Sequence, residues 1–189
     1  PDTVCCRKFP RLKLIIVTEP DPSAGCAYQF QRLLETGRSM DREILKKRMK
    51  EISPFDDATI IHTSGTTGKP KGVVLCHAQL IESAWSHVEK MELTCEDRFY
   101  MSSPMFHSLG CIGSVMSSIA AGSTLVFAGG KGCEGLLDTL REEQCTVLSG
   151  VPTVYFRLLE QAERSPEGAG GLRLRLCVSA GAPCPSSVY

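Results

Sequence analysis

The ten residues from Thr63 to Gly72 have a composition suited to holding phosphate groups. Their sequence is TSGTTGKPKG, and it lies between two apolar runs, at 58–61 and 73–75. Glycines allow backbone N–H groups to turn toward an anion, threonine and serine hydroxyls add donors, and lysine adds a positive charge. Each hydrogen bond to a charged phosphate oxygen contributes about 1.5–3 kcal/mol, so several converging donors can hold a triphosphate. The stretch predicts a nucleotide-phosphate site.

The spacing of the glycines excludes two common phosphate loops. A Walker loop requires a second glycine five residues after the first, but Pro70 lies five residues after Gly65 and Val73 lies five after Gly68. A kinase-type loop requires two glycines two residues apart, and Thr67 occupies that position after Gly65. The alternative to a phosphate site is that residues 63–72 form a polar surface loop without function.

Two further stretches place polar or glycine-rich segments directly after expected strands. Residues 104–110 read PMFHSLG, and residues 179–185 read SAGAPCP. A single histidine beside a phenylalanine is usually a packed structural residue, and a glycine-rich turn is common by itself. Neither stretch therefore indicates a function by itself.

The three stretches together resemble one enzyme family. TSGTTGKPKG resembles, over its full length, the phosphate loop of the adenylate-forming superfamily, which includes acyl-CoA synthetases, luciferases and the adenylation domains of peptide synthetases. MFHSLG and SAGAPCP are most similar to the medium- and long-chain fatty acyl-CoA synthetases. The resemblance covers essentially the whole chain, and it implies that residues 1–189 are part of the large N-terminal AMP-binding domain of such an enzyme.

The resemblance also implies particular roles. The implied ligand-binding residues are Thr63, Ser64, Gly65, Thr66, Thr67, Gly68 and Lys71 for the phosphates, His107 for the carboxylate pocket, and Gly181, Ala182 and Pro183 for the adenylate. Of these, Lys71 and His107 would take part in the chemistry. The implied substrates are a fatty acid, ATP and coenzyme A, in an acid–thiol ligase reaction that passes through an acyl-adenylate.

The resemblance leaves several alternatives open. An adenylating enzyme that acts on a carrier protein shares all three motifs, and a non-catalytic nucleotide- or partner-binding module would need only the phosphate loop. The glutamate that holds Mg²⁺ in the family, its ribose-binding aspartate and its C-terminal domain with the adenylating lysine all follow later than Tyr189, so no metal ligand is expected within this sequence. We therefore expect the 189 residues to be catalytically inert alone.

Apolar periodicity predicts the elements that must position these motifs. The expected strands cover 11–18, 58–62, 72–76, 97–101, 124–127, 146–150 and 172–178, and the expected helices cover 27–38, 41–52, 77–91, 112–121, 136–143 and 151–159. Alternating strands and helices predict an α/β fold with a largely parallel sheet and helices on both faces. Because each motif follows a strand, all three are expected at one edge of the sheet.

Composition excludes several other classes of protein. Lysine and arginine (21) balance aspartate and glutamate (21), so no basic surface for nucleic acid or anionic membrane is expected. No C-x-x-C occurs among the ten cysteines, which mostly lie in apolar runs and suggest buried thiols in a reducing compartment. The location expected is cytoplasmic, or alternatively mitochondrial, and the oligomeric state is undetermined.

Two segments imitate other functions. Residues 102–130 contain no Asp, Glu, Lys or Arg, but seven serines, His107 and the break at 122–123 favour a buried helix and strand over a membrane span. Residues 130–135 fit G-x-G-x-x-G after a strand. The next expected strand, 146–150, ends without the acidic residue that a dinucleotide site requires, so these glycines are interpreted as a loop.

Overall fold

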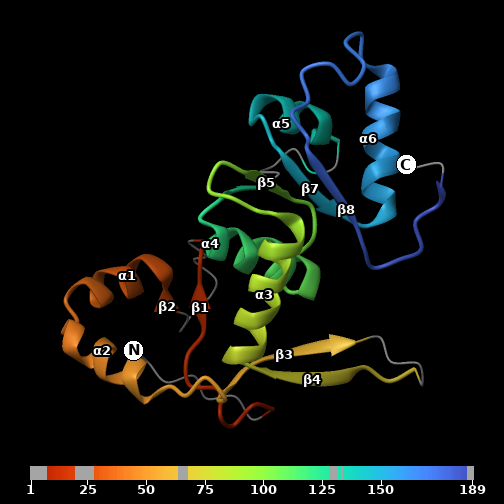
Figure 1. Ribbon diagram of the computed structural model, residues 1–189. Coiled ribbons are helices and arrows are strands. Elements are labelled where there is room, and N and C mark those ends of the chain that lie inside the picture. The colour runs from red at the N-terminus through yellow and green to blue at the C-terminus, as the bar shows by residue number, and fades with distance from the viewer. Residues whose placement is uncertain (1–7, 20–27, 64–67, 128–131, 133, 187–189) are drawn as a thin grey trace. The chain divides into compact units, whose positions relative to one another are not determined.

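The computed structural model describes residues 8–19, 28–63, 68–127, 132 and 134–186. The chain forms two compact units, Pro1–Ser53 and Pro54–Tyr189, which are described separately. The second unit contains all three motifs (Figure 1).

The first unit holds two short strands and two helices. Strands β1 (Ile16–Val17) and β2 (Tyr28–Gln29) pair in parallel, and helices α1 (Phe30–Arg38) and α2 (Arg42–Glu51) follow. Both helices were predicted. The prediction of a covered strand over 11–18 was wrong, because only two residues of that run find a partner strand among the described residues and most of its side chains are exposed.

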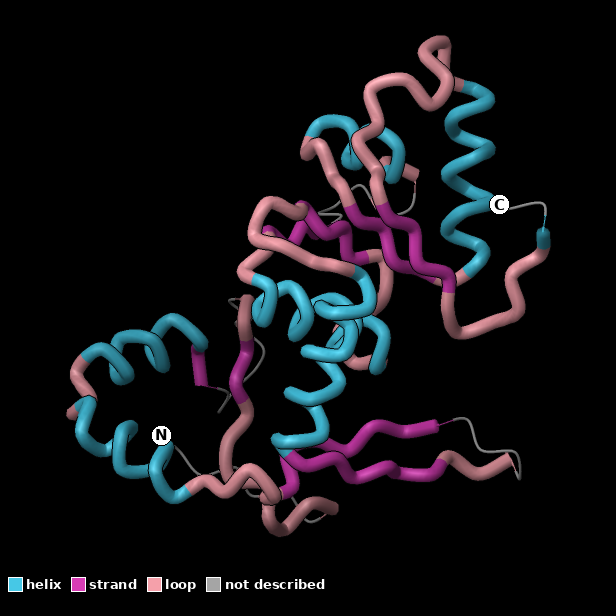
Figure 2. The backbone as a smooth tube through the Cα atoms, in the orientation of Figure 1, coloured by secondary structure: helices cyan, strands magenta, loops and turns pink. Residues whose placement is uncertain are grey.

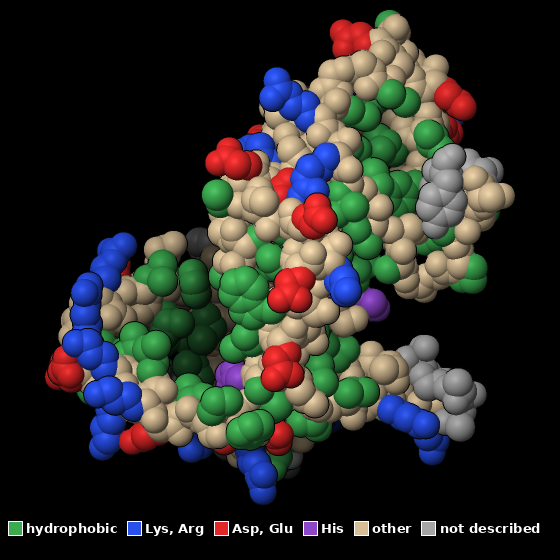
Figure 3. Space-filling view, in the orientation of Figure 1, with side chains coloured by type: hydrophobic (Ala, Val, Ile, Leu, Met, Phe, Trp, Pro, Cys, Tyr) green, Lys and Arg blue, Asp and Glu red, His purple; other side chains and the backbone are tan. Residues whose placement is uncertain are grey.

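Helix α2 is a solvated helix, as its charge pattern indicates. Asp41 caps its N-terminus by accepting a hydrogen bond from the backbone N–H of Glu43, and Lys46 pairs with Glu43 at 2.7 Å. Figure 3 shows blue and red side chains side by side over α1 and α2. The basic run 46–48 is therefore part of a mixed-charge surface.

The second unit begins with a two-stranded antiparallel hairpin. Strands β3 (Asp57–Thr63) and β4 (Lys71–Cys76) run side by side over their whole length (Figure 2). Both strands were predicted, but as members of the parallel sheet, and that placement was wrong. Only seven residues, 64–70, connect them, whereas a parallel crossover requires about a dozen or more.

The rest of this unit is a four-stranded parallel sheet in the order β6-β5-β7-β8, which confirms the α/β prediction. Its strands are β5 (Arg98–Met101), β6 (Thr124–Phe127), β7 (Val147–Gly150) and β8 (Leu176–Ser179). Its helices are α3 (His77–Met91), the π-helix η1 (Leu109–Met116), α4 (Ser117–Ala121), α5 (Leu136–Glu142) and α6 (Pro152–Arg164). The predicted helix over 112–121 thus begins earlier and is π-helical in its first part. No helix among the described residues is long and apolar enough to cross a membrane.

Side chains alternate between the two faces of this sheet, and each face has its own helices. Phe99 and Val147 pack with residues of α3 and α4 on one face. Tyr100 and Leu148 pack with α5 and α6 on the other face, around the fully buried Leu140. The period of two along each strand therefore determines which helix pair covers which face, as expected for a parallel sheet buried on both sides.

The cysteines are more varied than the sequence indicates. All that the structure describes are free thiols. Cys145 is completely buried, and this burial raises the pKa of its thiol to about 11. Cys76 and Cys111 are half-buried, whereas Cys177, which was expected to be buried, is exposed.

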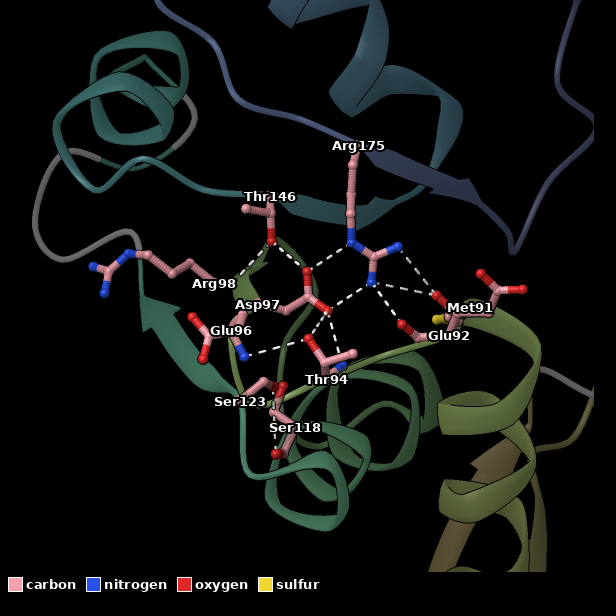
Figure 4. A network of polar contacts seen from close by, with 10 residues as sticks. All are labelled: Met91, Glu92, Thr94, Glu96, Asp97, Arg98, Ser118, Ser123, Thr146 and Arg175. Atoms are coloured by element: carbon pink, nitrogen blue, oxygen red, sulfur yellow. Dashed lines mark hydrogen bonds and ion pairs between the residues drawn. The ribbon is translucent and has the colours of Figure 1, made fainter.

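An ion pair between a buried aspartate and a partly exposed arginine connects the amino ends of the strands (Figure 4). The Asp97 carboxylate, only 3% exposed, accepts hydrogen bonds from Nε and a terminal nitrogen of Arg175, at 2.8 and 2.6 Å. It also accepts from the Thr146 hydroxyl at 2.7 Å and from the Thr94 backbone N–H at 2.9 Å. Arg175 donates in addition to the carbonyl of Glu92 at 2.9 Å. The hydrogen bonds from Arg175 are the largest cause that holds the pKa of Asp97 well below its usual value, against the opposing effect of burial.

Replacing Arg175 by methionine should destabilise this unit and change its response to acid. The substitution leaves the Asp97 carboxylate buried without its cation, so we expect the free energy of unfolding at pH 7 to fall by about 2–3 kcal/mol. Because the folded pKa lies below the unfolded value of about 3.9, the contribution of Asp97 is complete above about pH 5 and is lost as the pH falls. In the variant this acid dependence should be shallower. Urea unfolding at several pH values measures both effects.

The control is Arg173→Met, which removes an exposed arginine two residues away. It should leave the denaturation midpoint nearly unchanged. Equal losses in the two variants would mean that the Asp97 ion pair has no special role.

Candidate functional site

The described part of the phosphate stretch lies at the tip of the β3–β4 hairpin. Thr63 and Lys71 are directly opposite each other in the ladder and so flank the connection between the strands. Gly68 lies in that connection with a positive φ of 79°. The predicted residues Ser64, Gly65, Thr66 and Thr67 lie outside the described residues. The structure therefore brings the two ends of the stretch together and leaves its centre untested.

The other two motifs line one cavity of about 440 Å³ beside the parallel sheet. His107, Ser108, Leu109 and Ile112 contribute from the segment after β5. Ala180 and Gly181 contribute from the turn after β8. The volume is within the usual range for a small-molecule site, about 300–1,000 Å³. The prediction that motifs after different strands converge at the carboxyl edge holds for these two; among the described lining residues none comes from the hairpin.

The backbone geometry of residues 103–110 positions His107. A Cβ on Gly110 would lie 2.2 Å from the carbonyl oxygen of Pro104 and 2.7 Å from that of Ser103, so only glycine fits there. The backbone N–H of His107 donates to the same Pro104 carbonyl at 3.1 Å. Pro104 therefore holds both ends of the loop that presents the histidine to the cavity.

The π-helix η1 forms the next part of the wall. Its wider turns change the backbone pairing at its ends, and two buried serines use carbonyls there. The hydroxyl of Ser114 donates to the carbonyl of Leu109 at 3.2 Å, and that of Ser117 donates to the carbonyl of Ile112 at 2.8 Å. A π-helical segment is rare in proteins and is frequently found at functional sites.

The turn after β8 is held by the strand beside it. Ala180 N–H donates to the Gly150 carbonyl at 3.1 Å, and Gly181 adopts a φ of 84°, which favours glycine. Beneath the turn, the Tyr155 hydroxyl lies 2.9 Å from the Leu148 carbonyl and 2.7 Å from that of Val178, and burial raises the pKa of this tyrosine well above its usual value. The predicted residues Ala182 and Pro183 continue the turn but are exposed and are not among the described lining residues.

Helix α3 supplies a wall that the motif analysis missed. Ser83, Ser86 and His87 all line the cavity. Their spacing of i, i+3 and i+4 forms a polar stripe on a helix whose buried side is apolar, with Leu80 and Ala84. That stripe was a usable signal in the sequence, although a solvated helix face would produce the same pattern.

The described lining carries no Asp, Glu, Lys or Arg, so its polar groups are hydroxyls, backbone and two imidazoles. Among the residues that the structure describes, no group of three or more metal-ligating side chains occurs. Of the three glycines at 130–135, Gly132 and Gly135 lie in turns, as the interpretation as a loop predicts, and Gly130 lies outside the described residues.

Comparison with known proteins identifies the family. The AMP-binding enzyme family matches residues 5–189, which is nearly the whole chain. This chain is an AMP-binding family member. YngI of Bacillus subtilis, which carries a provisional assignment as an acyl-CoA synthetase, is 31% identical over 188 residues, covering all of this chain and 34% of its own length. The mitochondrial medium-chain acyl-CoA ligase ACSF2 of Danio rerio is 28% identical over 192 residues, covering all of this chain and 31% of its own length.

Structural similarity agrees with the sequence. The structure of VinN with L-aspartate superposes with a TM-score of 0.70 at 26% identity, over 93% of this chain and 45% of VinN. The chain spans about a third of the length of the two curated relatives. The fold and the family of the AMP-binding segment are thereby established.

Substitution of Gly110 by alanine tests how the histidine loop is built. The added methyl group would overlap the Pro104 carbonyl, so the loop must shift, and we expect a loss of at least about 2 kcal/mol of stability. Gly113→Ala is the matched control in the same π-helix, because its nearest neighbour is the movable Leu109 side-chain tip at 3.3 Å. Its cost should be within about 1 kcal/mol. Denaturant midpoints compare the two, and equal midpoints would contradict this account of the loop.

Proposed function

We propose that this chain is the part of a carboxylic acid–coenzyme A ligase that binds ATP and the acid. The observation that carries the proposal is that His107 and Gly181, from two family motifs, line the same cavity at the carboxyl edge of the parallel sheet. Membership in the AMP-binding family supports it, as do relatives named for acyl-CoA synthesis. ATP and coenzyme A would be the co-substrates.

The reaction has two steps. A carboxylate oxygen attacks the α-phosphorus of ATP, the bond to the bridging oxygen breaks, and pyrophosphate leaves with that electron pair. The thiol sulfur of coenzyme A then attacks the acyl carbon, AMP leaves, and the thiol proton is released. Charge on the phosphates rises in the first step, so fixed donors and cations contribute most.

In this reaction, residues of this chain would donate hydrogen bonds and supply positive charge to the substrates. Leu109 N–H donates to Nδ1 of His107 at 3.2 Å, so the neutral ring carries its proton on Nε2 and can donate it to a carboxylate. Lys71, opposite Thr63 at the hairpin tip, would offer its ammonium group to the phosphates. If Mg²⁺ takes part, it would supply further charge neutralisation.

The acid we propose is a fatty acid of medium or long chain. The MFHSLG and SAGAPCP stretches support this, as does the medium-chain ligase among the relatives. The VinN complex contains an amino acid instead, so polar acids must be included in any assay. A carrier protein in place of coenzyme A is distinguished by supplying each acceptor in turn.

Lys71→Ala should lower acid-dependent ATP–pyrophosphate exchange about 10²–10³-fold, since it removes a cation that would stabilise the transition-state charge. The assay uses the longest natural polypeptide that contains this chain, with a panel of fatty and polar acids. Lys69→Ala is the matched control, two residues away in the same stretch, and should cost less than about tenfold.

Equal losses at positions 69 and 71 would reject the specific role of Lys71. An absence of exchange with every acid, although ATP binds, would favour a non-catalytic module. The same assay on the 189 residues alone tests whether they are inert by themselves.

A further inference from the structure

The cavity contains two histidines whose hydrogen bonds require opposite tautomers. A backbone N–H can only donate, so the contact from Leu109 N–H to Nδ1 of His107 at 3.2 Å makes that nitrogen an acceptor. Neutral His107 therefore bears its proton on Nε2. This side chain offers a ligand a hydrogen-bond donor.

In His87, the same ring nitrogen, Nδ1, is a hydrogen-bond donor instead of an acceptor. Its Nδ1 lies 3.4 Å from the hydroxyl oxygen of Ser117. That hydroxyl already donates its one proton to the Ile112 carbonyl at 2.8 Å, so toward His87 it can only accept. Neutral His87 therefore bears its proton on Nδ1 and has a lone pair on Nε2. This side chain offers a ligand a hydrogen-bond acceptor.

We propose that the cavity selects a carboxylic acid that carries a hydroxyl group on its chain, with the carboxylate at His107 and the hydroxyl donating to Nε2 of His87. The proposal rests on the proposed function, because it takes the acid-binding role of His107 from there. It adds a second recognition point on α3 and names a narrower class of acid.

The lining favours a hydroxyl over other substituents. A second carboxylate at this point would be unfavourable, because its oxygens and Nε2 of His87 are all hydrogen-bond acceptors. An ammonium group would be a charge with no counter-charge, because the described lining has no aspartate or glutamate. An unsubstituted chain would leave Nε2 of a half-buried imidazole without a donor. Serines 83 and 86 lie on the same helix face and can also bond to a hydroxyl oxygen.

Equilibrium binding is the primary test, because it does not depend on turnover. Calorimetry on the longest natural polypeptide compares unsubstituted, hydroxylated and dicarboxylic acids of matched length, with the hydroxyl moved along chains of about four to ten carbons to suit the cavity. We expect one hydroxylated acid to bind about three- to tenfold more tightly than its unsubstituted and dicarboxylic counterparts, the range expected for one additional hydrogen bond to a half-buried acceptor.

Variants at position 87 assign the effect. His87→Leu should abolish the preference for the hydroxylated acid, and His87→Gln, whose amide oxygen can accept, should retain part of it. His77→Leu removes the histidine at the start of the same helix, which is not a described lining residue, and should leave the preference intact. Nitrogen-15 NMR of the imidazoles should show the proton of His87 on Nδ1 and that of His107 on Nε2.

The outcomes separate this inference from the proposed function. Tightest binding of unsubstituted acids, a preference that His87→Leu does not change, or no binding of any acid would each overturn the inference. A hydroxyl preference that depends on His87, without pyrophosphate exchange for any acid, would support the inference and reject the ligase activity.

Discussion

The ion pair between Asp97 and Arg175 is the constraint on which the second unit depends. It connects the turn before β5, the segment before β8 and the C-terminal end of α3. Thr146 adds the start of β7 by donating to the same carboxylate. These contacts hold the amino ends of the strands in register and hold α3 against one face of the sheet (Figure 4). With one edge fixed in this way, the opposite edge can carry loops whose shapes are set by function.

That division explains why the cavity wall has so many backbone constraints. At the carboxyl edge, the loops of the cavity wall are positioned by close contacts between backbone segments, such as Gly110 against the Pro104 carbonyl. Side-chain hydroxyls that donate to backbone carbonyls add to this. Tyr155 does the same for β7 and β8 by lying within hydrogen-bonding distance of a carbonyl on each. Such contacts use few charged groups. The described lining contains no Asp or Glu, so a bound carboxylate would meet oriented dipoles and imidazoles there instead of a competing anion.

Much of the fold could be predicted from the sequence because the local spacing of apolar residues determines where most helices and strands form. Alternation in β5 and β7 assigns Phe99 and Tyr100 to opposite faces, and helix α3 has the predicted bounds. The antiparallel hairpin was missed although its seven-residue connection excludes a crossover, because the strand–loop–strand pattern was interpreted by analogy with parallel sheets. The strand over 11–18 failed for a different reason. An apolar run becomes a strand only where a partner strand exists, and a partner is not a local property.

Some residues of the candidate site could be found from sequence motifs, and others could be found only from the three-dimensional structure. His107 and Gly181 lie in strings that resemble a family, and the chemistry they would serve is common to all its members. His87 lies in no such string. Its role depends on Ser117, 30 positions away, whose proton is already committed to a carbonyl of the π-helix. Which nitrogen of His87 is protonated follows only from that three-dimensional count of donors and acceptors. Residues that distinguish one acid from another are expected outside such strings, because a motif shared by enzymes with different acids cannot encode the difference between them.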